Sequence, residues 1–542
     1  MTHPTPQSKR VVRLMALNLS ERDLSIGLVM LKEFARLDPT VEANYSIHLH
    51  QWMKDFSNMG APGTVDGLVL EEVVDSLDPE NTDVFGMSMY VWSHDFMLAV
   101  ARRVRERNPS AVILFGGSQA GGYGARLLED HPFVDYVIKG EAEYSFRAFL
   151  LGLLDGDVGQ VRNLFWRDED GVATRVPDDW RAAKKQSYLK TIEDLPLPFR
   201  SQEYRDYLDN LDHQVTAQFE TERGCPLQCA FCSWGTGLPI RRRTREDVEE
   251  GLLYLLNHPN VKAVYVVDAN PFINQDKGLW LSEFVRHKNK TGKPVYFELN
   301  PEYVRDPRVI ENLGRLQGDE LAFGLQSTSD ATLKKIKRKF HRDVYERNVG
   351  RLRELNPNAN IKFSLILGLP ADTYDSFLGS LDFVIRMRPS DIYVHDLLIL
   401  PGSEMYAHPE RFGITIDWEP PHRLVHNDSF PRQDYNRAKL LGFATKVLHN
   451  DRTVRDRMLA LQSVVGGRHV DLYRRLVDML MAAGLDLLEG SRIDEVSSER
   501  FDYLTKAFHG DDERVETLRA LVDVFEASEL EAARKRGHRR VA

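Results

Sequence analysis

The sequence predicts an α/β protein of three parts: an N-terminal doubly wound domain of the flavodoxin or Rossmann type, a central partial (β/α)6 barrel, and a helical C-terminal region. Three observations favour this fold class. Short apolar runs alternate with amphipathic stretches over roughly the first 150 residues, six further strand and helix repeats follow, and the rest of the chain shows helical patterns without repeated strand signals. A chain of 542 residues is also too long for one hydrophobic core.

The N-terminal part alternates five strands with five helices. The strands are expected at Arg10–Leu17, Tyr45–Trp52, Asp83–Tyr90, Ala111–Gly117 and Val134–Gly140. The helices are expected at Ile26–Leu37, Gly67–Ser76, Phe96–Arg107, Gly121–Asp130 and Tyr144–Leu154. Strands rich in Val, Ile and Met, with helices between them, predict a parallel sheet covered on both faces. Ligands of such sheets bind beyond the carboxyl ends of the strands.

The central part repeats the same pattern six times. Its strands are expected at Gln218–Glu222, Ala263–Asp268, Val295–Leu299, Leu321–Gln326, Lys362–Leu367 and Ile392–Ile399. Its helices include Arg245–Leu256, Leu279–His287, Ala331–Lys337, Arg342–Leu355 and Thr373–Met387. The repeats predict a partial barrel whose active site lies at the carboxyl ends of the strands.

We therefore expect a first domain at residues 1–158, a linker at 159–212, the barrel at 213–402 and a helical region at 403–542 that closes the substrate cavity. The linker holds a small hairpin strand at Asn163–Arg167 and a rigid proline-rich run near residue 196. In the last part, Asn427–Tyr435 is expected to be a loop and the tail from Glu529 a charged, solvated helix.

Composition excludes several classes of protein. Charged residues make up 28% and hydrophobic residues 42% of the chain, as in ordinary globular proteins. The formal net charge of -10 argues against a nucleic-acid backbone as the main partner. No apolar run approaches twenty residues, so no membrane partner is expected.

The chain has only three cysteines, Cys225, Cys229 and Cys232, within one eight-residue stretch. Thiolate is the ligand that iron-sulfur clusters take, so these residues can hold three corners of a [4Fe-4S] cluster and leave the fourth iron open. A disulfide framework would need even pairing and a secreted context, and no apolar leader is seen at the start of the chain. Structural zinc is the stronger rival, but no second Cys or His pair follows at matching spacing. The unpaired thiols and an oxygen-sensitive cluster predict a cytoplasmic location.

The spacing Cys-x3-Cys-x-aromatic-Cys, with Phe231 as the aromatic residue, resembles the signature of radical S-adenosylmethionine (SAM) enzymes. The flanking runs Glu220–Cys225 and Cys232–Gly235 resemble the cobalamin-dependent branch of that family. The resemblance implies that SAM binds the open iron through its amino and carboxylate groups and is cleaved after reduction, by a reductant such as flavodoxin or ferredoxin. It also assigns the three cysteines as metal ligands and Phe231 as a cofactor-binding residue.

Three segments of the N-terminal part, 86–93, 115–117 and 134–143, resemble the cobalamin-binding domain of the same branch. The cofactor-binding residues that this resemblance implies are Ser88, Tyr90, Trp92, Gly116, Gly117, Ser118, Gly140 and Glu141. No histidine has an aspartate two positions before it, so the usual lower histidine ligand of cobalt is missing. The lower face is then expected to meet water or an unreactive side chain from Asn18–Asp23 or Val91–Asp95. His94 is a candidate ligand, although a lone histidine at a helix start is more often a cap or surface group.

At the barrel mouth, the resemblance implies SAM-binding residues at the ends of the third and fourth strands. Glu298, Gln326 and Ser327 are the candidates there, although by residue type each could equally be a satisfied polar group of the barrel. Leu369 belongs to a run, 366–373, that resembles the family's adenine-bordering Gly-Leu-Pro-Gly-Glu-Thr; an alanine replaces the second glycine and puts its backbone conformation in doubt.

Asp268 follows the second strand and is the candidate catalytic residue. It could contact the amino group of SAM, bind substrate, or occupy the open iron; the last role would replace radical chemistry by polar methyl transfer.

Taken together, the resemblance implies a cobalamin-dependent radical SAM C-methyltransferase that moves a methyl group from methylcobalamin to a carbon of a small-molecule or peptide natural-product intermediate. No cysteine is left over for a methyl-cysteine intermediate. Alternatives are a cobalamin-using rearrangement or cyclisation enzyme without methyl transfer, a non-radical methylcobalamin-dependent methyltransferase, and, in a different class, a cluster or cobalamin sensor.

Overall fold

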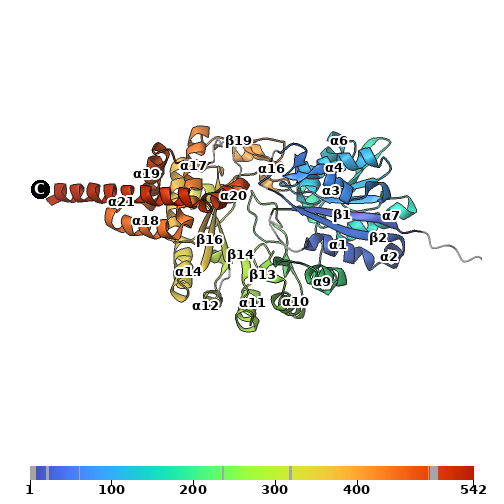
Figure 1. The fold of residues 1–542 in the computed structure, drawn as a ribbon. Helices are drawn as coiled ribbons and strands as arrows, with labels where there is room; N and C mark the ends of the chain where they lie inside the picture. Colours follow the sequence, from blue (N-terminus) through green and yellow to red (C-terminus); the bar gives the residue numbers. More distant parts are fainter. Residues whose placement is uncertain are drawn as a thin grey trace, which may run out of the picture.

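The computed structural model describes residues 8–19, 24–55, 57–59, 61–234, 237–316, 320–485, 487–488, 493 and 498–541. Residues 20–23, expected to face cobalt, and Gly235 of the signature lie outside the described residues. The N-terminal sheet lies at one end of the molecule, the barrel in the middle, and the C-terminal helices at the other end, from which the long helix α21 projects (Figure 1).

The N-terminal sheet has seven strands in the order β2-β1-β5-β6-β7-β8-β9. Their bounds are β1 Arg10–Asn18, β2 Tyr45–Met53, β5 Val84–Ser88, β6 Val112–Gly116, β7 Tyr136–Ile138, β8 Leu164–Asp168 and β9 Gly171–Thr174. The first five in sheet order are parallel, which confirms the predicted doubly wound sheet, and β8 and β9 are antiparallel additions. The first sheet therefore extends past residue 158, where we expected the domain to end.

Helices cover both faces of this sheet. One face carries α1 Ile26–Arg36, α2 Pro39–Asn44 and α7 Glu143–Asp155. The other carries α3 Leu70–Ser76, α4 His94–Arg107, α5 Ser118–Tyr123 and α6 Ala125–Asp130. The single helix expected at 121–130 is broken, because Gly124 has φ 56° and a Cβ there would lie 2.7 Å from the Phe165 ring. The small hairpin β3 Thr64–Val65 with β4 Leu68–Val69 and the short helix η1 Pro79–Asn81 complete this part.

The barrel is a six-stranded parallel sheet in sequence order, β10-β13-β14-β15-β16-β17, as predicted. Its strands are β10 Val215–Phe219, β13 Val261–Val266, β14 Val295–Leu299, β15 Glu320–Gln326, β16 Asn360–Leu367 and β17 Asp391–Asp396. Its helices are α10 Arg245–Asn257, α11 Gln275–Lys288, α12 Pro307–Leu313, α13 Asp330–Lys335, α14 Arg342–Leu355 and α15 Tyr374–Arg386, with η3 Pro301–Tyr303. The linker contributes α8 Trp180–Gln186, η2 Pro198–Arg200 and α9 Gln202–Asp209.

The C-terminal part packs into the same hydrophobic core as the barrel. Its elements are α16 Glu404–Ala407, η4 Pro409–Phe412, β18 Ile414–Ile416, β19 Leu424–Asn427, α17 Arg432–Asn450, α18 Arg452–Val465, α19 His469–Ala482, α20 Ser498–His509 and α21 Asp512–Val541. The region is mainly helical, as expected, and the antiparallel hairpin β18–β19 adds two short strands that the sequence did not predict. Its strands have three and four residues, too few to show a period-two pattern. Among the described helices, none has both the length and the apolar character needed to cross a membrane.

Candidate active site

The three cysteines lie on a loop that its own backbone holds closed. The stems of the loop are β11 Glu222–Arg223 and β12 Arg241–Arg242, which pair antiparallel. Inside the loop, Leu238 N donates to Cys225 O (3.1 Å) and Cys232 N donates to Cys229 O (3.2 Å). The loop follows β10 at the carboxyl end of the barrel sheet, where the sequence placed it.

The three thiols form no disulfide and are close enough to affect one another. Burial, with smaller contributions from Cys232 and Cys229, raises the pKa of the Cys225 thiol to about 11. Arg338 Nη1 donates to Cys229 Sγ at 3.7 Å. Within the described part of the chain, no three His, Cys, Asp or Glu side chains converge as tightly as a single metal ion requires. A cubane does not need that convergence, because each cysteine binds a different iron.

The carboxyl edge of the N-terminal sheet faces this loop. The Tyr90 and Trp92 rings stack with centroids 4.6 Å apart, and Trp92 Nε1 donates to Leu17 O at 3.0 Å. Removal of the Tyr90 hydroxyl from solvent raises its pKa, while the hydrogen bond with Ser88 and the positive charge of Arg223 oppose the rise. Because Arg223 precedes the first cysteine by two residues, Tyr90 lies on the side of its domain that meets the cluster loop.

The two glycines after β6 have different surroundings. Gly117 has φ 91°, and a Cβ there would lie 2.5 Å from Met89 O, so the fold itself requires glycine. Gly116 has no atom within 4 Å of the position that a Cβ would take. The open side of Gly116 leaves room for a bulky ligand to approach the backbone, and Ser118 is exposed beside it at the start of α5.

Gly140 and Glu141 contact the linker, and Glu141 also contacts the barrel domain. A Cβ on Gly140 would lie 2.1 Å from Ser187 O. The Glu141 carboxylate accepts from Leu189 N at 2.7 Å and pairs with Arg241 Nη1 at 2.6 Å. These contacts account for both residues without a ligand, and their cofactor-binding role stays a prediction.

The predicted SAM-binding residues lie at the barrel mouth but differ in what they contact. Glu298 accepts from the Tyr265 hydroxyl at 3.2 Å, and Ser327 is buried beside Ser380, with its hydroxyl accepting from Ser329 N at 3.1 Å. Gln326 has φ 72°, and its buried Oε1 has no hydrogen-bond partner among the described residues. Of these candidates, Gln326 has an acceptor left for a ligand.

The run 366–373 keeps the backbone turn that the sequence put in doubt. Ala371 takes φ 64°, so it adopts the left-handed conformation that a glycine would adopt freely. Leu369 is fully buried, and its carbonyl accepts from Asn427 Nδ2 at 3.0 Å and from Asp372 N at 3.1 Å, so its cofactor-binding role stays a prediction.

Asp268 holds the stem of the cysteine loop. Its Oδ1 accepts from Thr221 N (2.8 Å) and Glu222 N (3.0 Å), and its Oδ2 accepts from the Thr221 hydroxyl and pairs with Lys277 Nζ (3.0 Å). Its exposed fraction is 1%. Each role predicted for Asp268 needs a carboxylate oxygen that is bonded elsewhere in this structure, so the contacts favour a positioning residue, and a catalytic role stays untested.

Arg338 is a site residue that the sequence analysis missed. Besides Cys229, it contacts Gly324 O on β15, next to Gln326, and its buried Nε has no partner among the described residues. In the sequence it belongs to the run Lys334–Lys339, which is typical of a solvated charged face. Only the fold brings it to the cluster loop.

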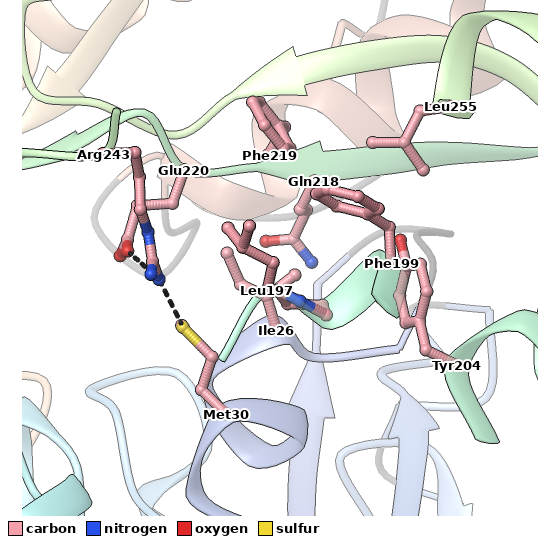
Figure 2. Close-up of a pocket in the computed structure, with 11 residues that line it drawn as sticks. Ile26, Met30, Leu197, Phe199, Tyr204, Gln218, Phe219, Glu220, Arg243 and Leu255 are labelled. Atoms are coloured by element: carbon pink, nitrogen blue, oxygen red, sulfur yellow. Dashed lines mark hydrogen bonds and ion pairs between the residues drawn. The ribbon is translucent and has the colours of Figure 1, made fainter. Parts of the chain in front are cut away.

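A separate small pocket lies between the first domain and strand β10 (Figure 2). Ile26, Phe199 and Phe219 wall it, and Arg243 closes one end by contacts to Glu220 (3.3 Å) and Met30 Sδ (3.4 Å). None of the cysteines is among the residues that line it. This pocket is therefore a gap between the two domains that the cysteines do not line.

Family models match both domains. Residues 26–150 match the B12 binding domain, and residues 220–384 match the radical SAM superfamily. The chain is therefore a radical SAM enzyme with an N-terminal B12 binding domain, as the residues around the cysteines and the strand ends suggested.

Among curated proteins, the chain is similar to 2-(S-pantetheinyl)-carbapenam-3-carboxylate methyltransferase of Streptantibioticus cattleyicolor, with 26% identity over 94% of this chain and 74% of the relative. It is also similar to the cobalamin-dependent radical SAM methyltransferase TokK of Streptomyces tokunonensis, with 27% identity over 61% of this chain and 48% of the relative.

Among solved structures, the cobalamin-dependent SAM radical enzyme OxsB, with aqua-cobalamin and SAM bound, shares the fold at a TM-score of 0.59 and 13% identity, covering 97% of this chain and 83% of OxsB. The methyltransferase TsrM of Kitasatospora setae, bound to tryptophan and a SAM analogue, matches at a TM-score of 0.55 and 14% identity, covering 76% of this chain and 80% of TsrM.

The residues present fit the cofactors that these two domains imply, which are cobalamin, SAM and a [4Fe-4S] cluster. Three thiols that form no disulfide, on one closed loop, suit the cluster. The space beside Gly116 suits a corrin, and the buried partnerless Oε1 of Gln326 suits a polar group of SAM.

Proposed function

We propose that the protein is a C-methyltransferase that places a methyl group carried by cobalamin on a carbon of a small-molecule or peptide natural-product intermediate. The observation that carries this proposal is the similarity to a carbapenam methyltransferase along 94% of the chain, which includes both cofactor domains and the C-terminal region. The relative's substrate is a small molecule, and we extend that substrate class to this chain.

When bound, the cofactors supply the methyl group and the one-electron cleavage of SAM, so the protein needs no nucleophilic side chain. The cysteine loop binds the cluster, the Gly116 backbone admits the corrin, and Gln326 and Arg338 offer polar atoms to SAM. The protein itself holds the cluster, SAM and cobalamin at fixed relative positions between its two cofactor domains.

Two further features belong to this proposal. An external one-electron reductant such as flavodoxin or ferredoxin supplies electrons to the cluster, and the protein works in the reducing cytoplasm. The C-terminal helices, which share the core of the barrel, close the substrate cavity.

The test is anaerobic reconstitution with iron, sulfide and cobalamin, followed by turnover with methyl-labelled SAM and candidate metabolites. Methyl transfer predicts a product heavier by one CH2 unit that carries the label. Cys229→Ser, which removes one cluster ligand, is expected to abolish the product, while the matched substitution of an exposed residue, Ser110→Ala, leaves it unchanged. Labelled product formed equally by Cys229→Ser would contradict the proposal.

Ring formation without methyl transfer is the second candidate. It is favoured by similarity to anaerobic magnesium-protoporphyrin IX monomethyl ester cyclase of Synechocystis, at 22% identity over 47% of this chain and 50% of that protein. Loss of hydrogen without gain of label identifies this reaction. Binding of both cofactors with no turnover of SAM identifies a sensor instead, and labelled product without cleavage of SAM to methionine and deoxyadenosine identifies polar methyl transfer.

A further inference from the structure

Both stems of the cysteine loop end in an arginine. Arg223 on β11 and Arg241 on β12 are paired directly across the small sheet that closes the loop. Arg223 lies two residues before Cys225. A contact made by either arginine therefore restrains the base of the loop that carries the cluster ligands.

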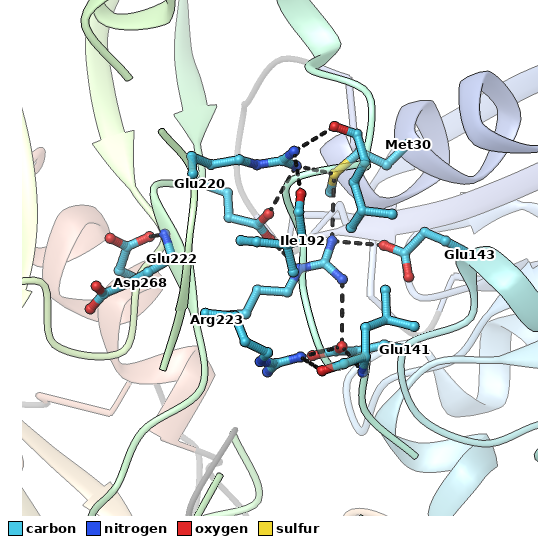
Figure 3. A network of polar contacts seen from close by, with 12 residues as sticks. Met30, Glu141, Glu143, Ile192, Glu220, Glu222, Arg223 and Asp268 are labelled. Carbon is cyan, nitrogen blue, oxygen red and sulfur yellow. Dashed lines mark hydrogen bonds and ion pairs between the residues drawn. The ribbon is translucent and has the colours of Figure 1, made fainter. Parts of the chain in front are cut away.

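Both arginines pair with one short segment of the B12 binding domain, and Figure 3 shows Arg223 beside Glu141 and Glu143 of that segment. Arg223 Nη2 pairs with Glu143 Oε1 at 2.7 Å, and Arg241 Nη1 pairs with Glu141 Oε2 at 2.6 Å. Arg223 Nη1 also lies 3.9 Å from Glu141 Oε2. We call these four residues the interdomain clamp.

The clamp is buried and anchored on each side. The exposed fractions of its side chains run from 5% for Arg241 and Glu143 to 20% for Glu141. On the barrel side, Arg223 Nε pairs with Glu220 Oε2 at 2.6 Å, and on the linker side Glu141 accepts from Leu189 N at 2.7 Å. Buried charges are retained at a cost in desolvation, so their presence favours a role in fixing one geometry over a role in adding stability.

The clamp lies between the two predicted cofactor sites. Glu141 and Glu143 follow β7, at the same carboxyl edge of the parallel sheet where Gly116 and Tyr90 lie. The strand ends at this edge belong to one hydrogen-bonded sheet, and the two arginines belong to the stems of the cysteine loop. The clamp is thus a direct polar connection between the edge that meets the corrin and the loop that meets the cluster.

We propose that the interdomain clamp couples the two cofactor sites, so that cluster binding at the cysteine loop strengthens cobalamin binding by the B12 domain. In this proposal the four clamp residues act as positioning residues through their contacts with one another, which for Glu141 replaces the cofactor contact predicted from the sequence. The proposal rests on the two cofactor sites of the proposed function but requires no methyl transfer, since coupling is a property of binding.

The experiment measures the dissociation constant of hydroxocobalamin, by absorbance titration under anaerobic conditions, for cluster-loaded and cluster-free protein. For the natural sequence we expect binding about fivefold or more tighter with the cluster present, at the low end of typical coupling between sites. Glu143→Gln keeps the shape of the side chain and removes its charge. For this variant we expect the ratio of the dissociation constant without the cluster to that with the cluster to fall close to one. Arg223→Lys keeps the charge but loses the forked contact, and we expect an intermediate ratio.

Glu419→Gln is the matched control. Glu419 pairs with Arg126 at 3.0 Å, also between the first domain and a later part of the chain, but both side chains are exposed. Its ratio should equal that of the natural sequence. A ratio near one in the natural protein, or an unchanged ratio in both Glu143→Gln and Arg223→Lys, overturns the proposal.

A second measurement separates coupling from misfolding. Each variant is checked for iron content and for the electron paramagnetic resonance spectrum of its reduced cluster, with and without hydroxocobalamin. We expect the corrin to change the spectrum of the natural protein and to change that of Glu143→Gln less, at equal iron content. If cluster binding strengthens cobalamin binding but no methylated product forms, the role of the clamp is supported and only the methyltransferase assignment is contradicted.

Discussion

Asp372 is a buried carboxylate next to the start of helix α15, with an exposed fraction of 1%. Its Oδ1 accepts from the Ser376 hydroxyl and from Thr373 N (3.1 Å). Burial raises the pKa of Asp372 from 3.8 to about 6, and these two hydrogen bonds oppose the rise only in part. The neutral carboxyl group is thus favoured in the folded protein, and ionisation at higher pH works against folding.

The size of the effect follows from the pKa. A raised carboxyl pKa contributes stability that is fully present below the unfolded value of 3.8 and is lost as the pH rises through about 6. At about 1.4 kcal/mol for each pH unit, the loss is about 3 kcal/mol by pH 7. Asp372→Asn keeps an acceptor for both hydrogen bonds and cannot ionise, so the variant should gain unfolding free energy over the natural protein as the pH rises from 5 to 8.

Urea unfolding at a series of pH values, followed by tryptophan fluorescence, measures this difference. Asp375→Asn, which removes an exposed carboxylate from the same helix start, is the control for loss of one charge. A difference between Asp372→Asn and the natural protein that is constant across this pH range, or that shrinks as the pH rises, refutes the reasoning.

Three further predictions concern single residues of the site. Ala371→Gly should stabilise the protein by roughly 0.5 to 1 kcal/mol in urea unfolding, because φ 64° is strained for alanine; a destabilised variant would contradict this. Gly117→Ala should weaken hydroxocobalamin binding several-fold and lower the melting temperature, because its Cβ would lie 2.5 Å from Met89 O; unchanged binding and stability would show that the turn can adjust. Cys229→Ser should bind less iron after reconstitution, while retained cluster absorbance at full iron content would mean that the loop does not ligate through this residue.

The sequence predicted the architecture well where strands are buried on both sides. The strand at 295–299 and the helix at 342–355 have the predicted bounds, because apolar runs flanked by amphipathic stretches are strong signals. The hairpin β18–β19 was missed because its strands are very short. The helix break at Gly124 was missed because the sequence shows a glycine there but not the positive φ that it takes in the fold.

Some residues of the candidate site could likewise be predicted from the sequence, and others could not. Three thiols within eight residues are a local pattern and could be found without a fold. The role of Asp268 could not, because its partners Thr221 and Lys277 are set by packing. The same holds for Arg338, which is separated from Cys229 by more than a hundred positions.

The sequence by itself determined which chemistry this protein can hold: its cysteine spacing and strand-end glycines are short-range features that fix ligand type and backbone freedom. Only the tertiary structure decided how the two cofactor domains meet, through Arg223 with Glu143 and Arg241 with Glu141, 80 and 100 positions apart. The physical reason is that ion pairs between distant segments form only after two hydrophobic cores have set the distance and orientation of their partners, and no local pattern in the chain records that geometry.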